Sequence, residues 1–130
     1  NIRGPVFEIL TGENIRLIDP VAYPGFVRLL MGAYIIVTDS GGIQEEAPSL
    51  GKPVVVIRDT TERPEGLEAG TNILAGTSRE GIYSTIKMLM EDKEKYRSMA
   101  KARNPYGDGT AAAQIHRIVK DYFASGDQGV

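Results

Sequence analysis

The chain has no cysteine and only one histidine, His116, among its 130 residues. The absence of cysteine excludes disulfides and thiolate metal sites, and it is compatible with a cytoplasmic protein, which we expect. Basic residues are not in excess, since the formal net charge is -2. Nothing in this charge favours nucleic acid or an anionic membrane surface as a partner. Long hydrophobic runs are also missing: the apolar stretches have the length of strands, and none would span a bilayer.

Side chains for metal or nucleophilic chemistry are scarce. His116 lies beside the apolar stripe of the last predicted helix, and no second ligand stands at a spacing typical of metal sites. We therefore interpret His116 as a surface residue and predict no metal site. Nothing resembles a Ser–His–Asp set, and the G-x-G-x-x-G motif is absent.

The composition is that of an ordinary globular domain. Hydrophobic residues make up 42% of the chain and charged residues 25%. We expect one domain over residues 1–125 and a disordered tail over residues 126–130. Because the chain begins at Asn1 rather than at a methionine, we expect a fragment or a processed product.

Four apolar runs are typical of strands, and helical patterns separate them. The runs lie at residues 15–18, 34–38, 54–58 and 72–75. A helix over about residues 42–50 is closed by Gly51, and Pro64 suits the first residue of a short helix. Ser78 is a candidate N-cap for the helical segment that follows it. The alternation predicts an α/β fold with a parallel, doubly wound, Rossmann-like sheet.

Polar residues follow three of the predicted strands. They are Asp19, which precedes Pro20, then Asp39 and Ser40, and finally Arg58 and Asp59. In such sheets, ligands bind beyond the carboxyl ends of the strands. The sequence therefore predicts that these strand ends converge on one functional edge.

Ser40, Gly41 and Gly42 stand where the second of these strands turns into a helix. Glycine lets a phosphate approach the backbone, and the unpaired N–H groups of a helix start favour an anion. The same three residues would also suit a plain tight turn with Ser40 as the N-cap. The neighbouring polar strand ends favour the phosphate interpretation.

Acidic and basic side chains flank this turn. Successive helical side chains diverge by roughly 100°, so only one of Glu45 and Glu46 should face the crevice. A carboxylate there could accept two hydrogen bonds from a ribose, or it could simply favour the helix start by roughly 0.3–1 kcal/mol. Arg63 ends the polar segment of residues 58–63, which suits either a salt-bridged loop or a diphosphate site. For Phe26 the sequence favours ordinary core packing.

Residues 38–65 closely resemble the non-hydrolysing UDP-N-acetylglucosamine 2-epimerases. The run is T-D-S-G-G-I-Q-E-E-A-P-S-L-G-K-P-V-V-V-I-R-D-T-T-E-R-P-E. The resemblance extends from N-I-R-G-P to R-N-P-Y-G-D-G-T-A and so covers nearly the whole chain. It implies part of the C-terminal Rossmann-like domain of a GT-B type enzyme. Such enzymes interconvert UDP-N-acetylglucosamine and UDP-N-acetylmannosamine without an added cofactor. The implied route removes the C2 proton, eliminates UDP to give a 2-acetamidoglucal, and adds UDP back.

Residue by residue, the resemblance implies a UDP site. Ser40, Gly41 and Gly42 would hold UDP, and Glu46 would bind the ribose hydroxyls. Arg63 would border the sugar diphosphate, Phe26 would pack on uracil, and Arg3 would face the cleft. No residue matches the acid/base carboxylates or the key histidine of the family, so we expect no catalytic residue in this chain. The N-terminal domain would be missing.

The resemblance also implies that the first two strands of the domain are absent. The runs at residues 15–18 and 34–38 would then each lose a neighbour, because the usual strand order is 3-2-1-4-5-6. Either the two runs pair directly or another chain fills the gap, and we expect a homo-oligomer. Two other functions stay open: a UDP-sugar-dependent GT-B glycosyltransferase, against which T-T-E-R-P-E argues, and a nucleotide-binding module without chemistry.

Overall fold

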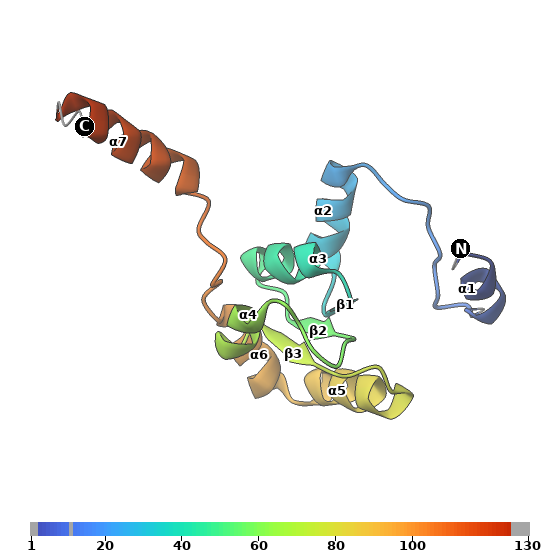
Figure 1. Cartoon of the computed structure of the whole chain (residues 1–130). Coiled ribbons are helices and arrows are strands. Elements are labelled where there is room, and N and C mark those ends of the chain that lie inside the picture. The colour runs from blue at the N-terminus through green and yellow to red at the C-terminus, as the bar shows by residue number, and fades with distance from the viewer. Residues whose placement is uncertain (1–2, 11, 126–130) are drawn as a thin grey trace.

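A parallel sheet lies at the centre of the computed structural model, which describes residues 3–10 and 12–125 (Figure 1). Its strands are β1 (Ile36–Thr38), β2 (Val54–Val56) and β3 (Asn72–Leu74). They form one three-stranded sheet in the order β1-β2-β3, and both pairs are parallel. Helices connect the strands, so the predicted α/β, Rossmann-like fold is confirmed.

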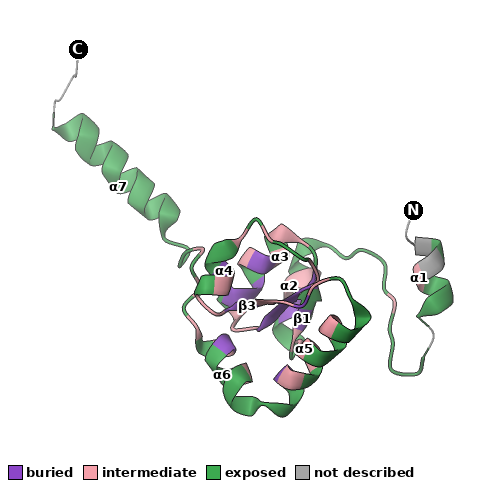
Figure 2. Ribbon diagram, turned by 60° about the horizontal axis from the view of Figure 1, so that its bottom comes forward, coloured by how far each residue is buried: buried purple, intermediate pink, exposed green. Residues whose placement is uncertain are grey.

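The middle strand explains why the sheet needs cover on both faces. All three valines of β2 are 0% exposed, and each buried side chain of this size contributes roughly 1.5–3 kcal/mol. Val54 and Val56 face one core cluster, whereas Val55 faces the other. Figure 2 shows the buried residues gathered on the strands and on the inner sides of the helices. The apolar run predicted such a doubly covered strand.

Helices from different parts of the chain cover the two faces. α2 (Tyr23–Gly32), α3 (Gly41–Glu46) and the 3₁₀ turn η1 (Ala47–Leu50) supply residues to the cluster around Val54. α5 (Arg79–Glu91) and α6 (Lys93–Lys101) supply Leu89 and Met99 to the cluster around Val55. The short α4 (Pro64–Glu68) connects β2 to β3.

The predicted ends of three helices are confirmed. Gly51 has a φ of 65° and closes η1 in the left-handed conformation that favours glycine. Pro64 is the first residue of α4. The Ser78 hydroxyl accepts a 3.0 Å hydrogen bond from the N–H of Gly81 and so caps α5.

The predicted strand at residues 15–18 is wrong. Those residues form no strand within the described chain, and they do not pair with β1. Ile15 is 44% exposed and Ile18 is 60% exposed. A strand exists only with a hydrogen-bonded neighbour, and the local apolar pattern carries no information about whether that neighbour is present. Direct pairing of residues 15–18 with residues 34–38 is therefore also excluded.

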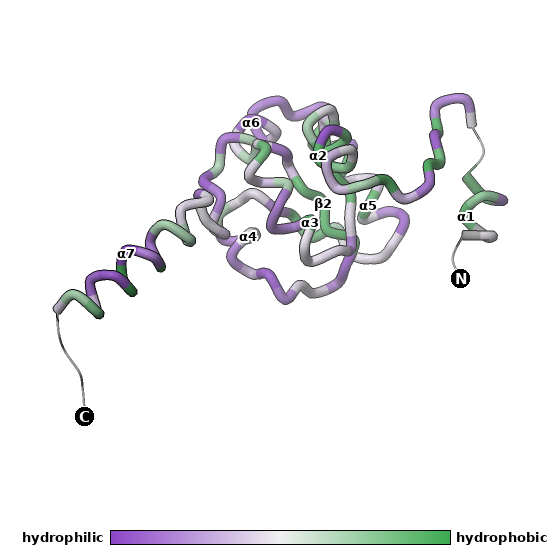
Figure 3. The backbone as a smooth tube through the Cα atoms, turned by 90° about the horizontal axis from the view of Figure 1, so that it is seen from above, coloured by the Kyte–Doolittle hydropathy of each residue, from purple (hydrophilic) through white to green (hydrophobic). Residues whose placement is uncertain are grey.

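The first and last helices project from the central body (Figures 1 and 3). α1 (Arg3–Ile9) leads through residues 12–22 to α2, while α7 (Ala111–Ala124) extends on the other side. Every residue of α7 is exposed, including the apolar side that the sequence predicts. None of the helices in the described ranges has both the length and the apolar character needed to cross a membrane. The predicted tail at residues 126–130 lies outside the described residues.

Candidate functional site

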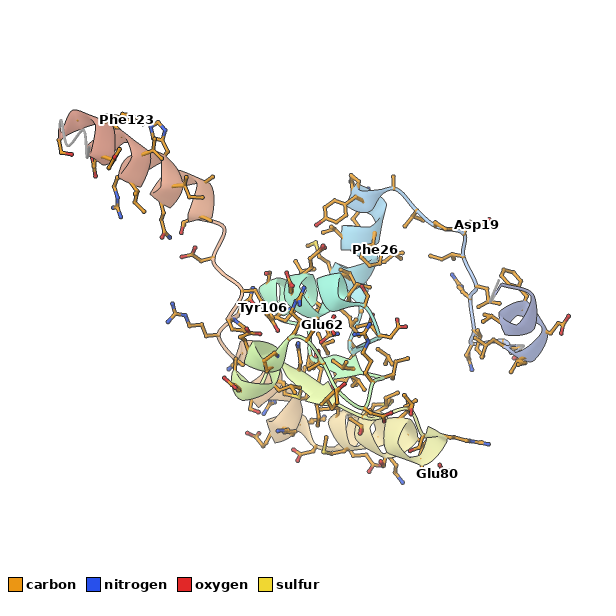
Figure 4. The ribbon with its side chains drawn as sticks, in the orientation of Figure 1. Asp19, Phe26, Glu62, Glu80, Tyr106 and Phe123 are labelled. Carbon is orange, nitrogen blue, oxygen red and sulfur yellow. The ribbon has the colours of Figure 1, made fainter. Side chains whose placement is uncertain are left out.

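The loops that follow β1 and β2 meet at one edge of the sheet. A Cβ added to Gly41 would lie 2.6 Å from Oε1 of Glu62, which shows how closely the two loops approach. The segment after β3 joins them, because the Thr77 hydroxyl donates to the Asp59 carboxylate at 3.3 Å. Asp19, in contrast, lies far from Glu62 (Figure 4). The predicted convergence is therefore right for the strand ends at Ser40 and Asp59 and wrong for Asp19.

A hollow of about 530 Å³ opens beside the loop after β2. Its lining residues come from residues 58–62 and from Thr77. A larger hollow of about 1070 Å³ lies elsewhere, between η1 and residues 103–109. The smaller one adjoins the end of β2, but residues 39–46 do not line it. The candidate site lies next to this hollow, between residues 39–46 and residues 58–63, where Gly41 approaches Glu62.

Ser40 occupies the N-cap position of α3 with extended backbone angles. Its N–H donates a 3.0 Å hydrogen bond to the Thr38 hydroxyl. Its own hydroxyl makes no capping hydrogen bond within the described chain. A plain tight turn would be expected to use that hydroxyl as a cap, so the side chain is available for another task.

The two glycines differ in what they permit. Gly41 is packed against the Glu62 side chain, whereas a Cβ on Gly42 would meet nothing closer than Ser40 Oγ at 3.9 Å. Neither has a positive φ, so an L side chain could adopt the backbone at both positions. Gly42 therefore faces open space.

Glu45 and Glu46 point to different neighbours, as the helical spacing predicts. Glu45 accepts a hydrogen bond from Nε of Arg63. Glu46 is exposed and accepts a 2.9 Å hydrogen bond from the hydroxyl of Tyr23. This hydrogen bond, followed by the negative charge of Glu46, raises the pKa of Tyr23.

Arg63 is held on both sides of its side chain. Besides its pair with Glu45, its Nη1 donates to the Glu62 carbonyl at 3.2 Å. The hydrogen bond with Glu45 and that residue's charge raise the pKa of Arg63. A second pair, Arg58–Glu62 at 2.6 Å, lies in the same loop. The salt-bridged loop that the sequence suggests is therefore present, and the Arg63 side chain remains 35% exposed.

Phe26 and Arg3 lie outside this group of contacts. Phe26 is half-buried on α2 and packs against the core cluster that contains Leu30 and Ala47, as the sequence favours. Its proposed contact with uracil stays a prediction. Arg3 begins α1, and its side chain lies outside the described residues.

Two residues of the site escaped the sequence analysis. Tyr23, the partner of Glu46, could have been noticed because it stands three positions before Phe26 and shares its side of a helix. Gln44 is 0% exposed and accepts a 2.7 Å hydrogen bond from the Thr61 hydroxyl, while its side-chain nitrogen is the one buried side-chain polar atom without a partner among the described residues. Within the described ranges no group of His, Cys, Asp and Glu could hold a metal ion.

Known proteins are similar to this chain over most of its length. A family model described as UDP-N-acetylglucosamine 2-epimerase matches residues 1–120. The UDP-N-acetylglucosamine 2-epimerase of Yersinia pestis is 53% identical over 123 residues, which are 94% of this chain and 33% of that protein.

Solved structures agree with the sequence relatives. A Staphylococcus aureus MnaA–UDP co-structure has a TM-score of 0.88 and 45% identity, covering 95% of this chain and 34% of that one. The Neisseria meningitidis UDP-GlcNAc 2-epimerase bound to UDP-GlcNAc has a TM-score of 0.85 and 47% identity, covering 92% of this chain and 33% of that one. The chain thus spans about a third of the length of these relatives. The family model covers most of the chain, including the sheet and α3 with Gly41 and Gly42, so the chain belongs to the UDP-N-acetylglucosamine 2-epimerase family.

Proposed function

We propose that this chain is the UDP-sugar-binding portion of an enzyme that interconverts UDP-N-acetylglucosamine and UDP-N-acetylmannosamine. One observation carries the proposal: α3 starts with Gly41 and Gly42 at the carboxyl end of β1, and Gly41 packs against Glu62 and Arg63 of the loop after β2. Relatives of this chain have been solved with UDP and with UDP-GlcNAc.

The diphosphate would bind at the start of α3. The first backbone hydrogen bond of this helix runs from the Gln44 N–H to the Ser40 carbonyl, at 3.2 Å. The N–H groups of residues 41–43 precede it and have no intrahelical acceptor, so they can donate to an anion. The Ser40 hydroxyl adds a further donor, and the missing Cβ of Gly42 lets the phosphate approach the backbone.

Arg63 would supply the positive charge. Its guanidinium has donors beyond those that Glu45 and the Glu62 carbonyl accept. A guanidinium stays charged throughout the physiological pH range. It can therefore neutralise charge on the diphosphate both when UDP is attached to the sugar and when it leaves.

Glu46 would hold the ribose, and Phe26 would contact the uracil. The Glu46 carboxylate is exposed, and Tyr23 occupies one of its oxygens with a 2.9 Å hydrogen bond. The other oxygen can accept from a ribose hydroxyl. Tyr23 thus keeps Glu46 on the α2 side of the site, which is also the side of Phe26.

In the proposed reaction this chain retains UDP while the sugar is converted. Loss of the C2 proton and cleavage of the C1–O bond release UDP and a 2-acetamidoglucal, and re-addition forms the epimer. The residues described here would keep UDP in place between the two steps. The proton would be handled by residues of the rest of the enzyme, since this chain offers no matching carboxylate or histidine.

A chimera tests the proposal. The chain would replace the matching third of the Yersinia pestis relative, and epimerisation would be followed by NMR of the two UDP-sugars. We expect interconversion by the chimera, and a matched chimera carrying Arg63→Ala should be much slower. A folded chimera that binds UDP but never interconverts the sugars would contradict the epimerase assignment and leave only the binding role.

A further inference from the structure

A polar cluster includes Thr61 of the loop of residues 58–63 and is buried at three of its five residues. We define it as Gln44, Thr61, Thr71, Asn72 and Tyr106. Gln44 is 0% exposed, Thr71 is 1% exposed and Asn72 is 4% exposed. Polar side chains at this depth are costly unless they are hydrogen-bonded, so their arrangement needs a reason beyond filling space.

Hydrogen bonds made by the cluster connect α3, α4, β3 and the loop of residues 58–63. The Asn72 side chain of β3 donates to the Gln44 carbonyl of α3 at 3.3 Å. The Thr61 hydroxyl donates to Oε1 of Gln44 at 2.7 Å. The Thr71 hydroxyl donates to the Gly66 carbonyl of α4 at 3.1 Å. The helix that starts at the glycine turn is therefore fastened to the helix that follows Arg63.

Tyr106 adds a contact from a distant part of the chain. Its hydroxyl donates to the Arg63 carbonyl at 3.3 Å across 43 residues of sequence. Tyr106 is itself anchored, because its N–H donates to Oδ1 of Asn104, whose Nδ2 donates to the Ser49 hydroxyl at 2.7 Å. Figure 4 shows Tyr106 beside the loop that carries Glu62.

Gly66 shows how closely Tyr106 packs against α4. A Cβ at Gly66 would lie 2.6 Å from the Tyr106 hydroxyl and would also collide with the Asn72 amide. The first turn of α4 is thus pressed against both side chains. The N–H of Arg63 is fixed as well, since it donates to the Thr61 hydroxyl at 3.1 Å.

We infer that Tyr106 is a positioning residue for Arg63 in the binding of a nucleoside diphosphate. Arg63 is held at its N–H by Thr61 and at its carbonyl by Tyr106, so the side chain starts from a backbone fixed on both sides. A preorganised cation binds an anion more tightly, because less conformational freedom is lost on binding. The inference rests on the proposed UDP site, and Tyr106 is not expected to touch the ligand.

A double-mutant cycle tests it. UDP affinity would be measured by calorimetry for Tyr106→Phe in the natural background and in an Arg63→Ala background. Tyr83→Phe serves as the matched control, because Tyr83 is 66% exposed on α5. We expect Tyr106→Phe to weaken UDP binding about fivefold in the natural background, the effect of one hydrogen bond, and less than twofold once Arg63 is absent. Tyr83→Phe should bind as the natural chain does.

The outcomes separate positioning from general stability. A purely structural Tyr106 would lower UDP affinity by the same factor in both backgrounds, which would overturn the inference. If Arg63→Ala leaves UDP affinity unchanged, the proposed role of Arg63 fails, and the inference fails with it. Unchanged affinity in Tyr106→Phe, together with a loss in Arg63→Ala, would overturn the inference alone.

A measurement without ligand separates the positioning role of Tyr106 from the proposed UDP site. Amide hydrogen exchange should be faster at Arg63 in Tyr106→Phe than in the natural chain, whereas Tyr83→Phe should leave it unchanged. Equal exchange in all three proteins would overturn the positioning role even if UDP binds. Absence of UDP binding by the natural chain would instead refute the proposed site.

Discussion

Replacing Gly42 by alanine should separate ligand binding from folding. The added Cβ would meet nothing closer than Ser40 Oγ at 3.9 Å, and Gly42 does not have a positive φ. The protein should therefore tolerate the change, and alanine in a helix is favoured over glycine by roughly 0.5–1 kcal/mol. A phosphate that contacts the backbone at this point would collide with the new methyl group. We expect the thermal midpoint to stay the same or rise while UDP affinity falls at least tenfold, about 1.4 kcal/mol.

Gly41→Ala is the comparison variant. There the Cβ would lie 2.6 Å from Oε1 of Glu62, so the Glu62 side chain must move and its pair with Arg58 must rearrange. Because the pair is exposed, its loss should cost no more than about 1 kcal/mol. Thermal unfolding and UDP calorimetry on both variants test whether the phosphate contacts the backbone at Gly42. If Gly42→Ala binds UDP as tightly as the natural chain does, the phosphate does not lie on this turn.

Three further predictions concern the ribose, the chemistry and the assembly of the chain. Glu46→Gln should weaken UDP binding by roughly 1–2 kcal/mol and leave the affinity for pyrophosphate unchanged. Calorimetry with UDP and its 2′,3′-dideoxyribose analogue should show that the mutant no longer prefers ribose. A mutant that discriminates between these ligands as the natural chain does would exclude Glu46 as the ribose ligand. The chain alone should not exchange the C2 proton of UDP-GlcNAc, because it has no base that matches the family's; deuterium at C2 in proton NMR, with contaminating enzyme excluded, would refute this. The chain should self-associate, since Val37 is 44% exposed on the open edge strand β1 and the apolar side of α7 is uncovered; light scattering that reports a monomer at every concentration would show otherwise.

The fold could be predicted where the determining interactions are local. The three valines of β2 predict a strand that is covered on both faces, and all three are fully buried. Gly51 and Ser78 end and begin helices through their own backbone and side-chain chemistry, so their roles follow from residue type. The strand predicted at residues 15–18 failed because its pattern is local but its existence depends on a partner strand, which the described chain does not supply.

The site was predictable in outline and not in its contacts. The divergence of Glu45 and Glu46 follows from helical geometry and is found in the structure. Their partners, Arg63 and Tyr23, come from other elements. No local pattern could assign Arg63 to Glu45 and Tyr23 to Glu46. Tyr106 lies 43 residues from the carbonyl that it binds, so only the folded chain brings the two together.

Chemical-shift mapping tests the central claim most directly. Addition of UDP to the isotopically labelled chain should shift the backbone amides of residues 40–46 and 61–63 most strongly. These residues surround the glycine turn and Arg63, where the structure brings the two loops together. Shifts confined to the hollow between η1 and residues 103–109, or no shifts at millimolar UDP, would contradict a UDP site at the ends of β1 and β2.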